Sequence, residues 1–183
     1  MSTKSQQPAA QAATHAPKPV EPDSNQSVIE IVRTYAAPRD VVWEVMTDPQ
    51  HVARWWGGPG VTNPVCEMDV RPGGQWHHVM RFPDGNEMHM DFVFLQVEEP
   101  HKLVWQQIAT SHGGGPRDIV FSVTLKDLGD DQTESKLVAH FRSAADREIA
   151  LAIGFSRPIE ASNERMAEYL QTYNRGPRAA HGR

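Results

Sequence analysis

The fold is decided by residues 75–98, which read QWHHVMRFPDGNEMHMDFVFLQVE. Asp84-Gly85 lies between two runs rich in aromatic and apolar residues, and this dipeptide tolerates the positive φ angles of a tight turn. The pattern predicts two strands, Gln75–Phe82 and Glu87–Glu98, joined by a compact turn. A long antiparallel hairpin is therefore expected in the middle of the chain.

This hairpin should have two chemically different faces, because side chains alternate along a strand. His89 and Asp91 fall on one face of the second strand. The opposite face carries the methionines and phenylalanines Met88, Met90, Phe92 and Phe94, and in the first strand Trp76, His78 and Met80 share a face. Thioethers and rings adapt to varied ligands, so these faces suit a pliable apolar cavity. The alternative is that they only fill the core, which is the simpler interpretation for any single residue.

The hairpin is flanked by further strands and, at both ends, by helices. Residues 28–35, 61–70, 102–108, 118–125 and 133–141 are β-rich, and Asn63-Pro64 indicates a bulge or an edge strand. Two short helices are expected between the first two of these strands, with Pro38 in the first turn of one and Pro49 opening the other.

The chain should return to helix after the last strand. Ser143 is a suitable N-cap for a short helix over 144–153, and a break near Gly154 separates it from a main helix over about 157–173. The apolar stripe of the main helix is expected to be Ile159, Met166, Tyr169, Leu170 and Tyr173. This element order predicts an α+β protein with an antiparallel sheet.

The charge and cysteine content of the chain limit the classes of binding partner and of cysteine chemistry that we expect. The 18 Lys and Arg against 23 Asp and Glu give a formal net charge of −5, so no basic surplus attracts a phosphate backbone, and we expect no nucleic-acid partner. The single cysteine, Cys66, cannot form an intramolecular disulfide. Its apolar neighbours favour a small buried hydrophobic residue over a nucleophile.

The ends of the chain differ in composition from its middle. Residues 1–26 are rich in Ala, Pro, Gln and Ser, which bury too little apolar surface to offset the entropy of ordering, so we expect a disordered tail. The folded domain is expected over 27–174, with a mobile tail at 175–183. No stretch approaches the roughly 20 apolar residues that span a bilayer, and no apolar signal segment is recognised, so the cytoplasm is the expected location.

Several short motifs occur together in a familiar order. They are Ala37–Trp43, Thr47-Asp48-Pro49, Trp55-Trp56-Gly57, Thr62–Gly74, Pro83-Asp84-Gly85, Leu103-Val104-Trp105 and Gly154-Phe155. Over about residues 28–173 the chain resembles the AHSA1-like branch (homologues of the Hsp90 ATPase activator) of the SRPBCC, or START/Bet v 1-like, superfamily. Each motif alone is weak, but their order makes the resemblance specific.

The resemblance implies a helix-grip fold. In this fold a curved antiparallel sheet wraps around a long C-terminal helix, two short helices follow the first strand, and a cavity lies between sheet and helix. Pro158 departs from the pattern and puts the start of the long helix in question. The side chains that we expect to bind a ligand in this cavity are Trp56, Trp76, Met80, Met90, Trp105, Phe121, Phe155 and Met166.

Two other segments border the expected cavity. Trp55 and Trp56 are consecutive and need opposite environments, so one should pack in the core and the other should stand at the cavity rim. The Gly-rich segment 111–116 resembles a phosphate loop only superficially, because it lacks the following Lys-Ser/Thr pair. We interpret it as a flexible loop.

The histidines and acidic residues of the hairpin suggest two kinds of chemistry. His77, His78, His89 and Asp91 include ligand types for a divalent ion, but His77 and His78 point to opposite faces, so we expect neither a metal nor another cofactor. His89 with Asp91, or His78 alone, could act as acid or base, and Arg81 is the remaining polar candidate. The family has no universal catalytic motif that would add to these candidates.

Three functions compete. The favoured one is a carrier or sensor that binds a small hydrophobic or aromatic molecule, such as a lipid, in the cavity. The second is an enzyme of the polyketide cyclase, aromatase or lyase type, which would need polar groups converging inside the same cavity. The third is an interaction module for the Hsp90 chaperone, as the family name suggests. The sequence is also compatible with a homodimer.

Overall fold

The computed structural model describes residues 27–110 and 115–173, so the expectations for residues 1–26, 111–114 and 174–183 lie outside it. In chain order the elements are β1 (Val28–Tyr35), α1 (Arg39–Thr47), α2 (Pro49–Trp55), β2 (Thr62–Met68), β3 (Gln75–Arg81), β4 (Glu87–Glu98), β5 (Lys102–Thr110), β6 (Val120–Gly129), β7 (Gln132–His140), α3 (Ala144–Ala152) and α4 (Ser156–Thr172). The predicted α+β architecture is confirmed.

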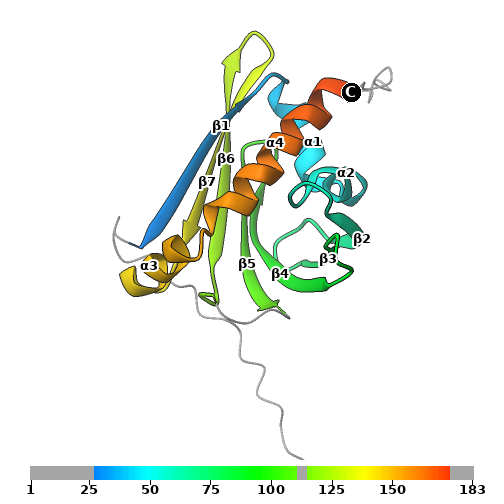
Figure 1. Ribbon diagram of the computed structural model, residues 1–183. Helices are drawn as coiled ribbons and strands as arrows, with labels where there is room; N and C mark the ends of the chain where they lie inside the picture. Colours follow the sequence, from blue (N-terminus) through cyan, green and yellow to red (C-terminus); the bar gives the residue numbers. More distant parts are fainter. Residues whose placement is uncertain (1–26, 111–114, 174–183) are drawn as a thin grey trace, which may run out of the picture.

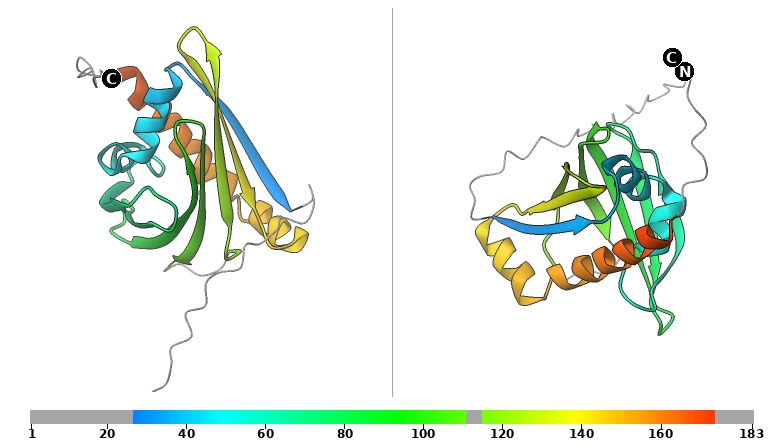
Figure 2. Two further views of the ribbon diagram at one scale, coloured as in Figure 1. Left: turned by 180° about the vertical axis from the view of Figure 1, so that it is seen from behind. Right: turned by 90° about the horizontal axis from the view of Figure 1, so that it is seen from above.

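The strands form one curved antiparallel sheet in the order β1-β7-β6-β5-β4-β3-β2. From β2 to β7, strands that follow one another in the chain are also neighbours in the sheet. Strand β1 pairs with β7 and forms one edge of the sheet, and β2 forms the other edge. Helix α4 runs along the concave face, with α1 and α2 near its C-terminal end and α3 at its N-terminal end (Figures 1 and 2). This is the helix-grip arrangement.

The central hairpin forms as its sequence predicts. Gly85 has a φ of +87°, which an L side chain would resist, and the Asp84 carboxylate accepts a hydrogen bond from the backbone N–H of Asn86 at 3.0 Å. The turn sets a register in which Arg81 faces Glu87 and His77 faces Asp91. Because the side-chain period is two, this register places the methionine and aromatic face toward α4.

The start of α4 resolves the question raised by Pro158. The helix begins at Ser156, so Pro158 is its third residue and lies in the first turn, where backbone N–H groups have no partner inside the helix. Gly154, with a φ of +74°, makes the predicted break between α3 and α4. Ser143 caps α3 as expected, its hydroxyl accepting a hydrogen bond from the N–H of Asp146 at 3.1 Å.

Several element boundaries differ from the sequence prediction by a few residues, and the largest difference is at the end of β6. Strand β6 continues to Gly129, four residues beyond the expected end at Leu125, because its last residues pair with β7. Asp130 and Asp131, both with positive φ, form a tight two-residue connection of the kind that fits the twist of a hairpin. In the N-terminal part of the fold, Pro38 is the residue before α1 rather than a residue of its first turn.

The main core lies between the concave face and the helices. Phe94 of β4 and Met166 of α4 are 0% and 1% exposed and belong to one cluster with aromatic residues from α1, α2, β3 and β5. A smaller cluster around Ile29, Ile119 and Phe141 lies toward α3. Among the described residues, no helix is long and apolar enough to cross a membrane.

Candidate ligand-binding cavity

A cavity of about 940 Å³ lies between the concave face of the sheet and α4. Every strand of the described sheet except β2 contributes to its wall, together with α1, α2 and the segment that joins α3 to α4. The volume falls in the upper part of the range of about 300–1,000 Å³ typical of small-molecule sites. Most of the wall is apolar, with methionines and aromatic rings prominent.

Seven of the eight side chains expected to line the cavity do so. They are Trp56, Met80, Met90, Trp105, Phe121, Phe155 and Met166. Four further methionine and phenylalanine side chains were not on that expected list, namely Met46, Phe82, Met88 and Phe92. Two of these, Met88 and Phe92, lie two residues before and after Met90 and so share its face of β4. The alternation of side chains along the strand could therefore have identified them.

Trp76 is the exception. It is 3% exposed and lies behind the cavity wall, with its ring centroid 4.8 Å from Trp56 and 4.7 Å from Phe92. The reason is Trp56: the chain after α2 places this ring over the concave face of β3 and covers Trp76. Trp76 therefore supports the wall without forming part of it.

The segment after α2 is held in place by two side chains of α4. Ser162 accepts a hydrogen bond from the Gly57 N–H at 2.9 Å and donates one to the Pro158 carbonyl at 2.8 Å. The Arg165 guanidinium donates to the carbonyls of Trp56, Gly57 and Gly58, each at 3.1 Å, and to that of Arg54 at 2.9 Å. One arginine thus binds the last turn of α2 and the chain that follows it through their carbonyls.

Gly57 is required at this point for steric reasons. Its φ is +88°, and a Cβ there would lie 2.7 Å from Cγ1 of Val61 and 3.3 Å from the Met80 sulfur. Trp55 packs in the core at 5% exposure, where its indole N–H donates to the Val45 carbonyl at 3.0 Å, while the partly buried Trp56 stands at the cavity wall. The two consecutive tryptophans therefore occupy the contrasting environments that the sequence predicts, although both border the cavity.

His78 is a structural residue behind the same wall. It is fully buried, its Nε2–H donates to the Asn63 side-chain oxygen at 2.8 Å, and its Nδ1 accepts from the Trp76 indole N–H at 3.3 Å. The Asn63 amide in turn donates to the carbonyls of Ala53 and Trp56. Burial, and secondarily the neighbouring His77, lowers the pKa of His78 to about 4, so the ring is neutral at physiological pH.

The other catalytic candidates lie on the convex face. Asp91 does not pair with His89, as the sequence suggested, but with His77 across the strands, at 2.6 Å between Nδ1 and Oδ1. Arg81 contacts Glu87 at 2.7 Å. None of the four candidates, His78, His89, Asp91 and Arg81, is among the described residues that line the cavity.

The fold also bears on metal binding by the described residues and on the reactivity of Cys66. Within residues 27–110 and 115–173, no group of three or more His, Cys, Asp or Glu side chains is arranged to hold a metal ion. Cys66 packs against the core cluster, and burial raises the pKa of its thiol to about 12. A thiol in that environment stays protonated and is a poor nucleophile, in line with the sequence interpretation.

A few polar groups interrupt the apolar wall. The Tyr35 hydroxyl donates to the Asn163 side-chain oxygen at 3.2 Å, and burial raises the pKa of Tyr35, which keeps the phenol neutral. Trp105, 4% exposed, stacks on Phe121 with 5.4 Å between ring centroids, and its indole N–H has no hydrogen-bond partner in the described part of the chain.

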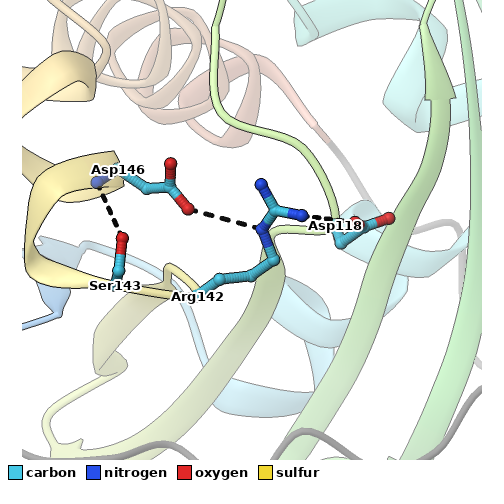
Figure 3. A network of polar contacts seen from close by, with 4 residues as sticks. All are labelled: Asp118, Arg142, Ser143 and Asp146. Carbon is cyan, nitrogen blue, oxygen red and sulfur yellow. Dashed lines mark hydrogen bonds and ion pairs between the residues drawn. The ribbon is translucent and has the colours of Figure 1, made fainter.

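Charged side chains occur at the end of the cavity near α3. Arg117 and Asp118 belong to the exposed segment before β6 and line the cavity there. Figure 3 shows Arg142 lying between Asp118 and Asp146, with distances of 3.5 and 3.4 Å, and Ser143 capping α3 beside them. Arg142 therefore links the segment before β6 to the first turn of α3.

Comparison with known proteins agrees with this architecture. A family model described as "Activator of Hsp90 ATPase homolog 1-like protein" matches residues 36–171. A solved structure from Nitrosomonas europaea is 21% identical with a TM-score of 0.73 over 82% of this chain and 97% of its own. One from Mycobacterium smegmatis is 21% identical with a TM-score of 0.71 over 85% of this chain and 97% of its own.

A Silicibacter pomeroyi protein called AHSA1 is 18% identical, with a TM-score of 0.61 over 79% of this chain and 98% of its own. No curated protein matches the chain in sequence. At these identities the structural likeness shows the fold alone.

Proposed function

The chain belongs to the family of Activator of Hsp90 ATPase homolog 1-like proteins, and from this premise we propose that it binds a small hydrophobic or aromatic molecule between its sheet and α4, as a carrier or sensor. The observation that carries the proposal is the cavity of about 940 Å³ and its wall of methionine and aromatic side chains. Thioethers and rings provide apolar contact while adapting to the shape of the ligand.

The expected affinity follows from the apolar surface that a ligand would bury. An apolar ligand whose binding buries roughly 500 Å² of apolar surface, counted on the ligand and the cavity wall together, gains about 12 kcal/mol at ~25 cal/mol per Å². Part of this gain offsets the loss of translational and rotational freedom on association. Micromolar binding is the expected result.

The experiment is a titration with a neutral apolar fluorescent probe, N-phenylnaphthylamine, followed by the same titration on variants with a filled cavity. Met90→Trp and Met166→Trp place an indole in the space between β4 and α4, and each should weaken probe binding at least tenfold. Overpacking costs about 1–3 kcal/mol of stability, so thermal melts must show that both variants remain folded.

The matched control is Leu95→Trp. Leu95 lies on β4 like Met90, but its side chain is exposed on the convex face and does not line the cavity. This variant should bind the probe like the parent protein. Failure of the parent to bind, or unchanged binding in both filled variants, would refute the proposal.

An enzyme of the cyclase or lyase type in the same cavity is the weaker alternative. Its catalytic groups would have to contact a substrate inside, whereas His78 lies behind the wall and His89, Asp91 and Arg81 lie on the convex face. A role confined to the Hsp90 chaperone would require no ligand, so the probe titration separates that role from the proposal.

A further inference from the structure

The end of the cavity near α3 carries a cation that pairs with no side chain in the described part of the chain. Among the described residues that line the cavity, Arg117 is the only cation and Asp118 the only anion. Asp118 is engaged by Arg142, 3.5 Å away outside the cavity (Figure 3). Arg117 makes no hydrogen bond or ion pair with the described part of the chain. Its guanidinium donors therefore remain available to a ligand.

Arg117 stands where the cavity meets solvent. Ile108 and Ile153 line the cavity and are 49% and 59% exposed, and a Cβ at Gly115, two residues before the exposed Arg117, would lie 3.3 Å from Cδ1 of Ile153. The opposite, interior part of the wall is formed by nearly buried side chains such as Trp55, Met90 and Met166. A ligand that extends from the mouth to the interior would thus meet a cation first and apolar groups afterwards.

We infer that the ligand is a carboxylate with a long apolar tail, a fatty-acid-like molecule, with its tail in the cavity and its head group on Arg117. This inference rests on the proposed function and specifies the chemical class of the ligand. A guanidinium presents paired N–H donors that match the two oxygens of a carboxylate. A charged head is costly to bury, so it remains at the exposed mouth while the tail fills the apolar interior.

The interior polar groups agree with this orientation. The Tyr35 hydroxyl already donates to Asn163, and the Ser162 hydroxyl is used by Gly57 and Pro158. Neither hydroxyl, nor the indole N–H of Trp105 that has no partner in the described part of the chain, supplies a positive charge that could balance a buried carboxylate. The only cation in the described wall is at the mouth, and that position fixes the direction in which the ligand lies.

The test is displacement of N-phenylnaphthylamine by decanoate and by decanol, which share a ten-carbon skeleton and differ in the charge of the head group. Arg117→Gln should weaken decanoate binding about threefold to fivefold, because the pair is exposed to solvent, and should change decanol binding less than twofold. Added salt should weaken decanoate binding in the parent protein and have little effect in the variant.

Arg71→Gln is the matched control. It changes the net charge by the same amount at an exposed turn where Arg71 pairs with Asp69, outside the cavity, and it should leave both affinities unchanged. Equal loss of decanoate affinity in Arg71→Gln, or none in Arg117→Gln, would overturn the inference while the proposed function stands. If neither compound displaces the probe although the probe itself binds, the long-chain ligand class is wrong. If the probe does not bind the parent, the proposed function itself fails.

Discussion

The two faces of the β3–β4 hairpin contain different chemistry on the same backbone. The concave face carries Met80, Met90 and Phe94 beneath α4, whereas the convex face carries His77 and Asp91, which pair at 2.6 Å with both side chains more than 40% exposed. Of the residues that look catalytic in the sequence, His89, Asp91 and Arg81 thus lie on the solvated convex face and His78 is buried behind the cavity wall. Apolar residues without chemical reactivity form the candidate site. Titratable side chains near one another in sequence are therefore poor guides to function unless their face is known.

The largest contrast between the faces is expected from truncating adjacent residues of β4. Phe94→Ala removes a fully buried ring and should reduce the free energy of unfolding by about 3–5 kcal/mol. Leu95→Ala, at a 42% exposed position on the other face, should change it by less than about 1 kcal/mol. Urea unfolding of both variants measures the difference, and comparable losses would contradict the assignment of the faces.

His78 should make the stability of the protein depend on pH, because burial lowers the pKa of its ring. Its pKa is about 4 in the folded protein and about 6.5 when unfolded, so between these values the unfolded chain binds the extra proton. Stability should fall by about 3 kcal/mol as pH decreases from 6.5 to 4, and this contribution should level off below pH 4.

Carboxylates titrate in the same pH range, so the contribution of His78 is obtained by comparing the parent protein with the variant His78→Gln. His78→Gln keeps a donor for Asn63 and an acceptor for Trp76 but does not titrate, so its stability should vary less over this range by the same amount. An identical pH dependence in the parent and His78→Gln would show that the ring is not held neutral by burial.

Removing the arginine that joins α4 to the chain after α2 should have an intermediate effect. Arg165→Gln loses hydrogen bonds to several carbonyls, and we expect a loss of about 1–3 kcal/mol in the free energy of unfolding. Arg165→Lys should restore little of it, because an ammonium group cannot reach carbonyls on two sides at once. Full stability in Arg165→Lys would mean that charge, rather than the geometry of the guanidinium, is what matters.

The smallest effect is expected on the convex face. Asp91→Asn breaks the ion-pair character of the contact with His77, but both side chains are solvated, so stability should change by less than about 1 kcal/mol. Probe binding should be unchanged. A large decrease in binding would place the convex face in the functional site and would revive the enzymatic interpretation.

The parts of the fold and of the site that could be predicted are those governed by local patterns. Alternation on β4 predicted which face is apolar, and Asp84-Gly85 predicted the hairpin turn. The pairing of His77 with Asp91 was missed although the signal was present, because a turn that sets Arg81 opposite Glu87 also sets 77 opposite 91. Register, not spacing along one strand, identifies such partners.

Other features depend on contacts between distant segments and had no local signal. Arg165 and Ser162 meet the chain after α2 across more than 100 residues of sequence. Trp76 shares a face with Met80, yet it is separated from the cavity by Trp56, whose position is set by α2 and α4. Which apolar residues form a wall and which lie behind it is a property of the packed molecule.

The central claim, that the cavity holds an apolar ligand, is tested most directly by NMR of methyl-labelled methionines during a titration with N-phenylnaphthylamine. The methyl groups of Met46, Met80, Met88, Met90 and Met166 line the cavity, whereas Met68 packs against the core without lining it. We predict concentration-dependent shifts for the cavity methionines and a nearly constant signal for Met68. Shifts absent from the cavity methionines, or as large at Met68 as at Met90, would contradict the account.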